Sequence, residues 1–157
     1  MAALIRILEN TDITSFDKGV IGHGVNCQHA MGSGVALAIS RKWPIVRHAF
    51  MQAPKGAEML GTTHIIRIND DLSIANMYTQ VFYGNDGKKY ADIKAIEKCV
   101  NDLFSYAESM GFCDIFIPQI GSKRGGLDWD TEVFPVINKC VQQRSVTMTL
   151  NICQYKE

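Results

Sequence analysis

The 157-residue sequence has no surplus of charge of either sign. Sixteen lysine and arginine residues balance sixteen aspartate and glutamate residues, so the formal net charge is zero. Broad electrostatic binding to nucleic acid or to an anionic membrane needs a basic surplus. We therefore expect neither partner, while a local basic patch stays compatible with the balance.

The sequence also lacks a long apolar run. No stretch approaches the roughly 20 apolar residues that a transmembrane helix needs. Arg6 and Glu9 interrupt the N-terminal segment where a signal peptide would have its apolar core. Hydrophobic residues make up 46% of the chain and charged residues 20%, as in ordinary folded domains. We expect one monomeric domain over residues 1–157, located in the cytoplasm.

Metal-binding cysteine patterns are missing as well. The five cysteines form neither a Cys-x-x-Cys pair nor a Cys/His metal spacing, so we predict no metal and no cofactor. Four of them lie in apolar or helix-like surroundings, where a buried free thiol is usual. Cys27 is the exception because it follows a glycine-rich strand end. A nucleophilic role is open to it, but no partner histidine is fixed by the sequence, which favours a packing role.

Two common nucleotide-binding fingerprints are absent. Gly32-x-Gly34 would need Gly or Ala at position 37, where Leu37 stands. No Gly-Lys-Ser/Thr ending of a P-loop occurs. A Rossmann dehydrogenase and a nucleoside triphosphatase are both poorly supported.

A glycine-rich turn between a strand and a helix is present instead. We name residues 31–36 the first glycine loop: Met31, Gly32, Ser33, Gly34, Val35 and Ala36. A strand that turns through glycines into a helix leaves backbone N–H groups unpaired at the positive end of the helix dipole, which favours phosphate. The alternative is an ordinary tight turn.

A second glycine loop follows a later apolar strand. It comprises residues 121–126: Gly121, Ser122, Lys123, Arg124, Gly125 and Gly126. Its glycines permit an anion-binding nest, and the two cations add positive charge, although a solvated surface loop would have the same composition. Because both loops join a strand to a helix, we expect them at one edge of the sheet, where together they suit a ligand with two phosphates.

The hydrophobic pattern alternates strands with helices. It predicts a helix-covered mixed sheet with one antiparallel hairpin that turns at Asn69, Asp70 and Asp71. The last helix would be capped by Asp130 or Thr131. The expected strands are 4–8, 20–25, 62–68, 72–78, 114–118 and 146–155, and the expected helices are 34–42, 45–52, 90–110 and 130–141.

Four motifs occur in an order that resembles a macro domain over nearly the whole chain. They are Asp12-Ile13-Thr14, His23-Gly24-Val25-Asn26, the first glycine loop, and the run from Pro118-Gln119-Ile120-Gly121 to Trp129. Within that family the sequence is most similar to the ADP-ribose 1''-phosphate phosphatase branch and to phage and bacterial single-domain proteins. The resemblance implies a three-layer α/β/α fold with a mixed, mostly parallel sheet of about six strands.

The resemblance also implies a small-molecule ligand, ADP-ribose or ADP-ribose 1''-phosphate. Asp12 would accept a hydrogen bond from the adenine amino group, with the Ile13 backbone beside it; by itself, Asp12 could equally cap a turn. Asn26 would bind the distal ribose, which Tyr83 would flank. The first glycine loop would hold the diphosphate, and Ile120 and the second glycine loop would close over it.

For catalysis, the resemblance assigns His23, with Asn26 beside it and no metal. A histidine titrates near neutral pH and can manage the protons of phosphomonoester hydrolysis. A histidine at a strand end is also often structural. Asp128 is the second catalytic candidate because it is the carboxylate nearest the second loop, and its alternative role is to cap the following helix.

The second loop departs from the family pattern in two ways. Lys123 stands where many macro domains have the later glycine of Gly-x-Gly, and Gly125 stands where the de-ADP-ribosylating branch has an acid. The first hypothesis is therefore an ADP-ribose 1''-phosphate phosphatase. The alternatives are a hydrolase that removes ADP-ribose from modified macromolecules and a non-catalytic ADP-ribose-binding module.

Overall fold

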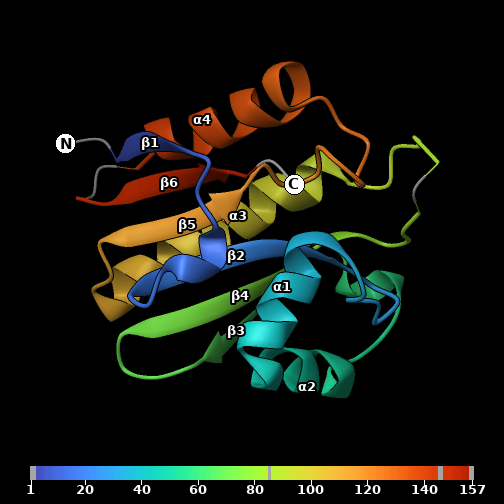
Figure 1. Cartoon of the computed structure of the whole chain (residues 1–157). Helices are drawn as coiled ribbons and strands as arrows, with labels where there is room; N and C mark the ends of the chain where they lie inside the picture. Colours follow the sequence, from blue (N-terminus) through green and yellow to red (C-terminus); the bar gives the residue numbers. More distant parts are fainter. Residues whose placement is uncertain (1–2, 85, 145–146, 156–157) are drawn as a thin grey trace.

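The computed structural model describes residues 3–84, 86–144 and 147–155 (Figure 1). These residues form a six-stranded sheet in the order β1-β6-β5-β2-β4-β3. Neighbouring strands are parallel, except that β3 is antiparallel to β4 at one edge. The predicted mixed, mostly parallel sheet is confirmed, with strands β1 (Leu4–Glu9), β2 (Gly19–Asn26), β3 (Thr63–Arg67), β4 (Leu72–Gln80), β5 (Asp114–Pro118) and β6 (Thr149–Gln154).

Helices cover both faces of this sheet and complete the three expected layers (Figure 1). One apolar cluster joins Val46 and Phe50 of α2 to side chains of β2 and β4. The other joins Leu103 of α3 and Ile137 of α4 to the opposite face. The helices are α1 (Gly34–Lys42), α2 (Pro44–Gln52), α3 (Ile93–Met110) and α4 (Phe134–Gln142), with short turns η1 (Ile13–Ser15), η2 (Ala57–Met59) and η3 (Trp129–Val133).

Strand β2 lies between β4 and β5, and this neighbourhood positions the site. β2 and β4 are buried along almost their whole length, because helices cover both of their faces. β1, at an edge, is mostly exposed or half-buried. Since β2, β4 and β5 are parallel, the segments that follow them all leave the sheet at the same rim.

Helix α3 begins three residues later than the predicted helix 90–110. The backbone N–H of Ala95 donates to the Asp92 carboxylate at 2.9 Å, so Asp92 caps the first turn and the helix starts at Ile93. At the other end Gly111 adopts a left-handed conformation with φ 77°, which is common for a glycine at a helix C-terminus. The apolar stripe of this helix is buried, with Ile96, Val100 and Leu103 among its residues.

The last helix corrects a prediction. Neither Asp130 nor Thr131 caps it; instead the backbone N–H of Thr131 donates to the Asp128 carboxylate at 2.9 Å. The first turn, η3, is a π-helix, and α4 follows it. Pro135 explains the irregular start, because it has no N–H to donate to the Thr131 carbonyl of a regular α-helix.

Three further predictions have mixed outcomes. The hairpin turn is confirmed: the Asn69 side chain accepts from the backbone N–H groups of Asp71 and Leu72. The final strand begins at Thr149, and Val146 of the predicted range lies outside the described residues. The prediction that the four cysteines other than Cys27 are buried is wrong for Cys113, which is exposed.

Within the described ranges, none of the helices combines the length and the apolar character that spanning a bilayer requires.

Candidate functional site

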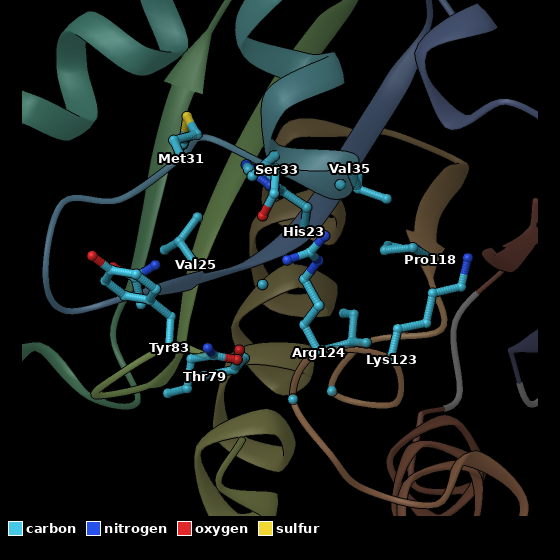
Figure 2. Close-up of a pocket in the computed structure, with 18 of the residues that line it drawn as sticks. His23, Val25, Met31, Ser33, Val35, Thr79, Tyr83, Pro118, Lys123 and Arg124 are labelled. Carbon is cyan, nitrogen blue, oxygen red and sulfur yellow. The ribbon is translucent and has the colours of Figure 1, made fainter. Parts of the chain in front are cut away.

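A cavity of about 920 Å³ opens at the carboxyl ends of β2, β4 and β5, between the two glycine loops (Figure 2). Neighbouring parallel strands bring their following loops to this rim, which is where open α/β sheets bind ligands. The sequence-predicted residues that line the cavity are His23, Asn26, Met31, Gly32, Ser33, Gly34, Val35, Ala36, Tyr83, Ile120, Gly121, Lys123, Arg124 and Gly125.

Asn26 shapes the approach to the first glycine loop. Its Oδ1 accepts from the backbone N–H groups of Gln28 at 3.0 Å and Ala30 at 3.1 Å, and its Nδ2 donates to the Ala30 carbonyl at 2.8 Å. These bonds hold the turn in which His29 has a φ of 60°. Asn26 thus has a structural role, and one Nδ2 hydrogen is left over for a ligand.

The first glycine loop ends in an open helix N-terminus. Ser33 is the N-cap of α1, yet its side chain makes no capping hydrogen bond. Gly34 has a φ of 61°, which a residue with a Cβ rarely adopts. A Cβ at Gly32 would meet no atom of the described residues within 4 Å, so these residues leave the space beside this glycine open. The first-turn N–H groups and the helix dipole therefore form an anion site that is open to the cavity.

The second glycine loop is a closed backbone structure. The Leu127 N–H donates to the Gly121 carbonyl at 2.9 Å, and the N–H groups of Tyr90 and Ala91 donate to the Gly125 carbonyl at 2.8 and 3.0 Å. Gly126 has a φ of 79°, and a Cβ there would overlap the Lys88 carbonyl. These glycines let the backbone pack on itself and turn the tip of the loop toward the cavity.

Two members of the second loop lie away from the cavity. The Ser122 hydroxyl donates to the Gln119 carbonyl at 2.6 Å, and neither Ser122 nor Gly126 belongs to the cavity lining. Their predicted ligand contacts therefore have no support in the geometry. Both residues stabilise the loop instead.

Among the described residues, two charged side chains line the cavity, and both are cations. Lys123 Nζ donates to the Tyr155 carbonyl at 3.1 Å, while the Arg124 side chain points from the second loop into the cavity toward the first loop (Figure 2). Among the described residues, no aspartate or glutamate lines this cavity. The cavity therefore combines two positive charges with a helix N-terminus, which makes it suited to an anion.

His23 is buried, with 1% of its surface exposed, and touches the cavity from β2. Its Nε2 lies 2.6 Å from the Asn76 Oδ1, and its Nδ1 has no partner in the described part of the chain. Burial lowers the pKa of His23 from 6.5 to about 4, and the bond to Asn76 only partly opposes this shift. The expectation that His23 titrates near neutral pH is therefore wrong, because desolvation keeps the ring neutral.

Asp12 and Ile13 lie in a smaller hollow of about 220 Å³. This hollow shares Val35, Pro118 and Tyr155 with the main cavity, so the two adjoin. The Thr14 N–H and hydroxyl donate to Asp12 Oδ1 at 2.9 and 2.8 Å. Asp12 thus caps η1, and its second carboxylate oxygen is left for a ligand.

Asp128 does not belong to the cavity lining. Its Oδ1 accepts from the backbone N–H and the hydroxyl of Thr131, each at 2.9 Å, and these bonds hold the pKa of the carboxyl below its usual value. The capping role, the alternative in the sequence analysis, is thus the one that the geometry supports. A catalytic role for Asp128 has no support here.

Sequence reasoning missed the lining residues that come from other strands. Thr79 and Gln80 end β4, and Cys153 and Tyr155 lie at the end of β6. Their position at a strand end was a usable signal, but the strand order that brings β6 next to β5 is absent from the sequence. Cys27 is buried outside the cavity lining, and burial raises the pKa of its thiol, consistent with packing.

Known proteins match most of this chain. A family model described as Macro domain matches residues 23–134. The DNA ADP-ribosyl glycohydrolase of Mycobacterium tuberculosis is 25% identical over 123 residues, which cover 76% of this chain and 34% of that protein, so the chain spans about a third of its length. An uncharacterized 17.5 kDa protein of Enterobacteria phage T4 is 27% identical over 134 residues, or 81% of this chain and 84% of that protein.

A solved structure has the same fold. Thermosipho africanus DarTG in complex with ADP-ribose superimposes with a TM-score of 0.75 at 20% identity. The match covers 96% of this chain and 41% of that one.

Proposed function

This chain belongs to the macro domain family, and on that premise we propose that its cavity binds ADP-ribose and that the protein hydrolyses ADP-ribose 1''-phosphate to ADP-ribose and phosphate. One observation carries the proposal: both glycine loops line one cavity, whose charged side chains among the described residues are Lys123 and Arg124. The structure of Thermosipho africanus DarTG is in complex with ADP-ribose, which supports ADP-ribose as the ligand of this cavity.

The diphosphate would lie between the two loops. The N–H groups at the start of α1 face the cavity with no side-chain cap from Ser33, so they are free to donate to phosphate oxygens. Arg124 points toward the same region from the opposite wall. Donors on both sides would fix the ligand more firmly than either loop alone.

The adenine would occupy the smaller hollow. Asp12 lies there, and one of its carboxylate oxygens is occupied by Thr14, which holds the side chain in place. The other oxygen would accept from the adenine amino group. The two adjoining hollows thus suit an elongated ligand with a base at one end and phosphates in the middle.

The distal end of the ligand decides between the possible reactions. Hydrolysis of a phosphomonoester forms a bond from the water oxygen to phosphorus and breaks the bond from phosphorus to the ribose oxygen. Its transition state carries negative charge on the phosphoryl oxygens, which Lys123 and Arg124 would stabilise. His23 lines the same cavity and is proposed to handle the proton of the attacking water, with Asn26 at the distal ribose.

A second candidate is removal of ADP-ribose from DNA. The mycobacterial relatives, of similar sequence, are named DNA ADP-ribosyl glycohydrolases. Cleavage of a glycosidic bond develops positive charge on the sugar and commonly uses paired carboxylates. The described lining residues include two cations and no carboxylate, which favours the phosphatase. A binding module without catalysis is the third possibility.

Parallel assays on ADP-ribose 1''-phosphate, ADP-ribosylated DNA and ADP-ribosylated protein test the proposal. We expect phosphate release from the first substrate, loss of that release in His23→Ala, and largely unchanged ADP-ribose affinity in the same variant. His48→Ala, which removes an exposed histidine of α2, is the matched control. Turnover of the DNA substrate alone would favour the second candidate, and binding without any turnover would favour the third.

A further inference from the structure

Asn76 is a buried polar residue to which the function described above gives no role. It lies in the middle of β4, with 0% of its surface exposed. Its neighbours on the same face of the strand, Ile74 and Tyr78, belong to the cluster that α1 and α2 cover. In the sheet, Asn76 is directly opposite His23 of β2.

The contact between these two side chains sets the protonation of the imidazole. Asn76 Oδ1 lies 2.6 Å from His23 Nε2, and an amide oxygen only accepts hydrogen bonds. Nε2 must therefore carry the hydrogen. In a neutral ring, Nδ1 is then an unprotonated nitrogen with a free lone pair.

The described residues offer no hydrogen-bond donor to that lone pair. Within the described ranges, His23 Nδ1 and Asn76 Nδ2 are both buried without a hydrogen-bond partner. Two unpaired polar atoms in an apolar cluster cost stability, and a pair of apolar side chains would avoid that cost. His23 also lines the cavity, which places its ring next to the space that a ligand or a water would occupy.

We propose that Asn76 is a positioning residue that fixes His23 in the tautomer protonated at Nε2, so that Nδ1 is an acceptor for the attacking water. This inference rests on the proposed phosphatase function. As the water oxygen bonds to phosphorus, one water proton moves to Nδ1. The bond from phosphorus to the ribose oxygen breaks, that oxygen takes a proton from solvent, and Nδ1 releases its proton to solvent, which leaves a neutral ring and balanced products.

The buried environment suits this proton cycle. The low pKa of His23 makes it a weak base but makes its protonated form a strong acid, which releases the proton readily to solvent after the attack. Loose phosphoryl-transfer transition states depend mainly on positioning and electrostatics, so a weak base is acceptable.

Three variants test the role of Asn76. Asn76→Leu removes the acceptor at similar volume, and Asn76→Asp keeps an acceptor for the Nε2 hydrogen. Ser73→Ala is the matched control: it removes a buried polar group of the same strand, whose hydroxyl lies 2.8 Å from the Tyr106 hydroxyl. We expect Asn76→Leu to lower kcat on ADP-ribose 1''-phosphate by at least about ten-fold with ADP-ribose affinity unchanged, Asn76→Asp to retain more activity, and Ser73→Ala to match wild type.

NMR of the imidazole nitrogens in the wild-type protein gives an independent answer. We expect His23 to be protonated at Nε2 and its Nδ1 signal to shift when ADP-ribose is added. A ring protonated at Nδ1, an Nδ1 signal that ignores the ligand, or an active Asn76→Leu variant with wild-type kcat would overturn the inference. If the wild type releases no phosphate, the proposed function fails, while the tautomer and the ADP-ribose titration still decide the role of Asn76.

Discussion

His23 illustrates how burial changes the chemistry that a residue type offers. A free histidine exchanges protons near pH 6.5, whereas burial in β2 lowers the pKa of His23 to about 4. The ring therefore stays neutral throughout the physiological range. In the proposed mechanism, the role of His23 depends on which nitrogen carries the hydrogen rather than on the net charge of the ring.

The same shift predicts a dependence of stability on pH. Because the pKa is lower in the folded state than in the unfolded state, the unfolded chain binds more protons between pH 6.5 and 4, and stability is lost as pH falls through that window. From pH 7 to pH 5, this group should remove about 2 kcal/mol of unfolding free energy. Urea denaturation of wild type and of His23→Gln at both pH values measures the difference. An equal loss in the two proteins would show that His23 is not buried in its neutral form.

At the residue scale, the sequence identified the groups that line the cavity through their own motifs. His23, Gly32 and Arg124 were found because strand ends, glycines and clustered cations have recognisable local patterns. Asn76 was missed because its partner lies on another strand, and nothing local marks that pairing. The protonation range of His23 was missed because desolvation depends on what packs around the ring.

At the scale of elements, the two glycine loops differ in why they need glycine. Gly126 has a φ of 79°, and a Cβ there would overlap the Lys88 carbonyl. This glycine is therefore needed for the backbone to fold and pack as it does. A Cβ at Gly32 would enter empty space beside the cavity, so this glycine leaves room for a ligand. The loops therefore respond differently to the same substitution.

We predict that Gly126→Ala lowers the unfolding free energy by at least about 1 kcal/mol, because both the backbone conformation and the contact are unfavourable. Gly32→Ala should leave stability unchanged or slightly raised but weaken ADP-ribose binding by about ten-fold or more. Gly87→Ala is the control for the backbone alone, since Gly87 has a φ of 80° and a Cβ there would meet no atom of the described residues within 4 Å. Chemical denaturation and calorimetric titration separate the two effects. Equal destabilisation in Gly126→Ala and Gly87→Ala would show that the contact with the Lys88 carbonyl adds nothing to the loss of stability.

The helices and strands were largely predictable, and their ends less so. The helical spacing of apolar residues predicted α3, yet its start depends on the hydrogen bond to Asp92. Pro135 was visible in the sequence, but the π-turn before α4 requires knowledge of how the preceding carbonyls are satisfied. Caps and prolines thus set boundaries that periodicity alone leaves uncertain by a few residues.

At the scale of the whole molecule, the order of strands creates the site. Placing β2 between β4 and β5 brings the first and second glycine loops to one rim, although about 85 residues separate them in the chain. Local patterns predicted that both loops follow strands and precede helices. That they share a cavity depends on the strand order, which no local pattern gives and which the sheet topology shows.

The central claim is that the two loops together hold a diphosphate. Calorimetric titration of the wild-type protein with ADP-ribose, and with AMP as a ligand that lacks the diphosphate, tests it most directly. We predict saturable one-to-one binding of ADP-ribose and binding of AMP at least about ten-fold weaker, because AMP cannot reach both loops at once. Equal affinity for the two ligands, or no heat from either at millimolar concentration, would contradict the account.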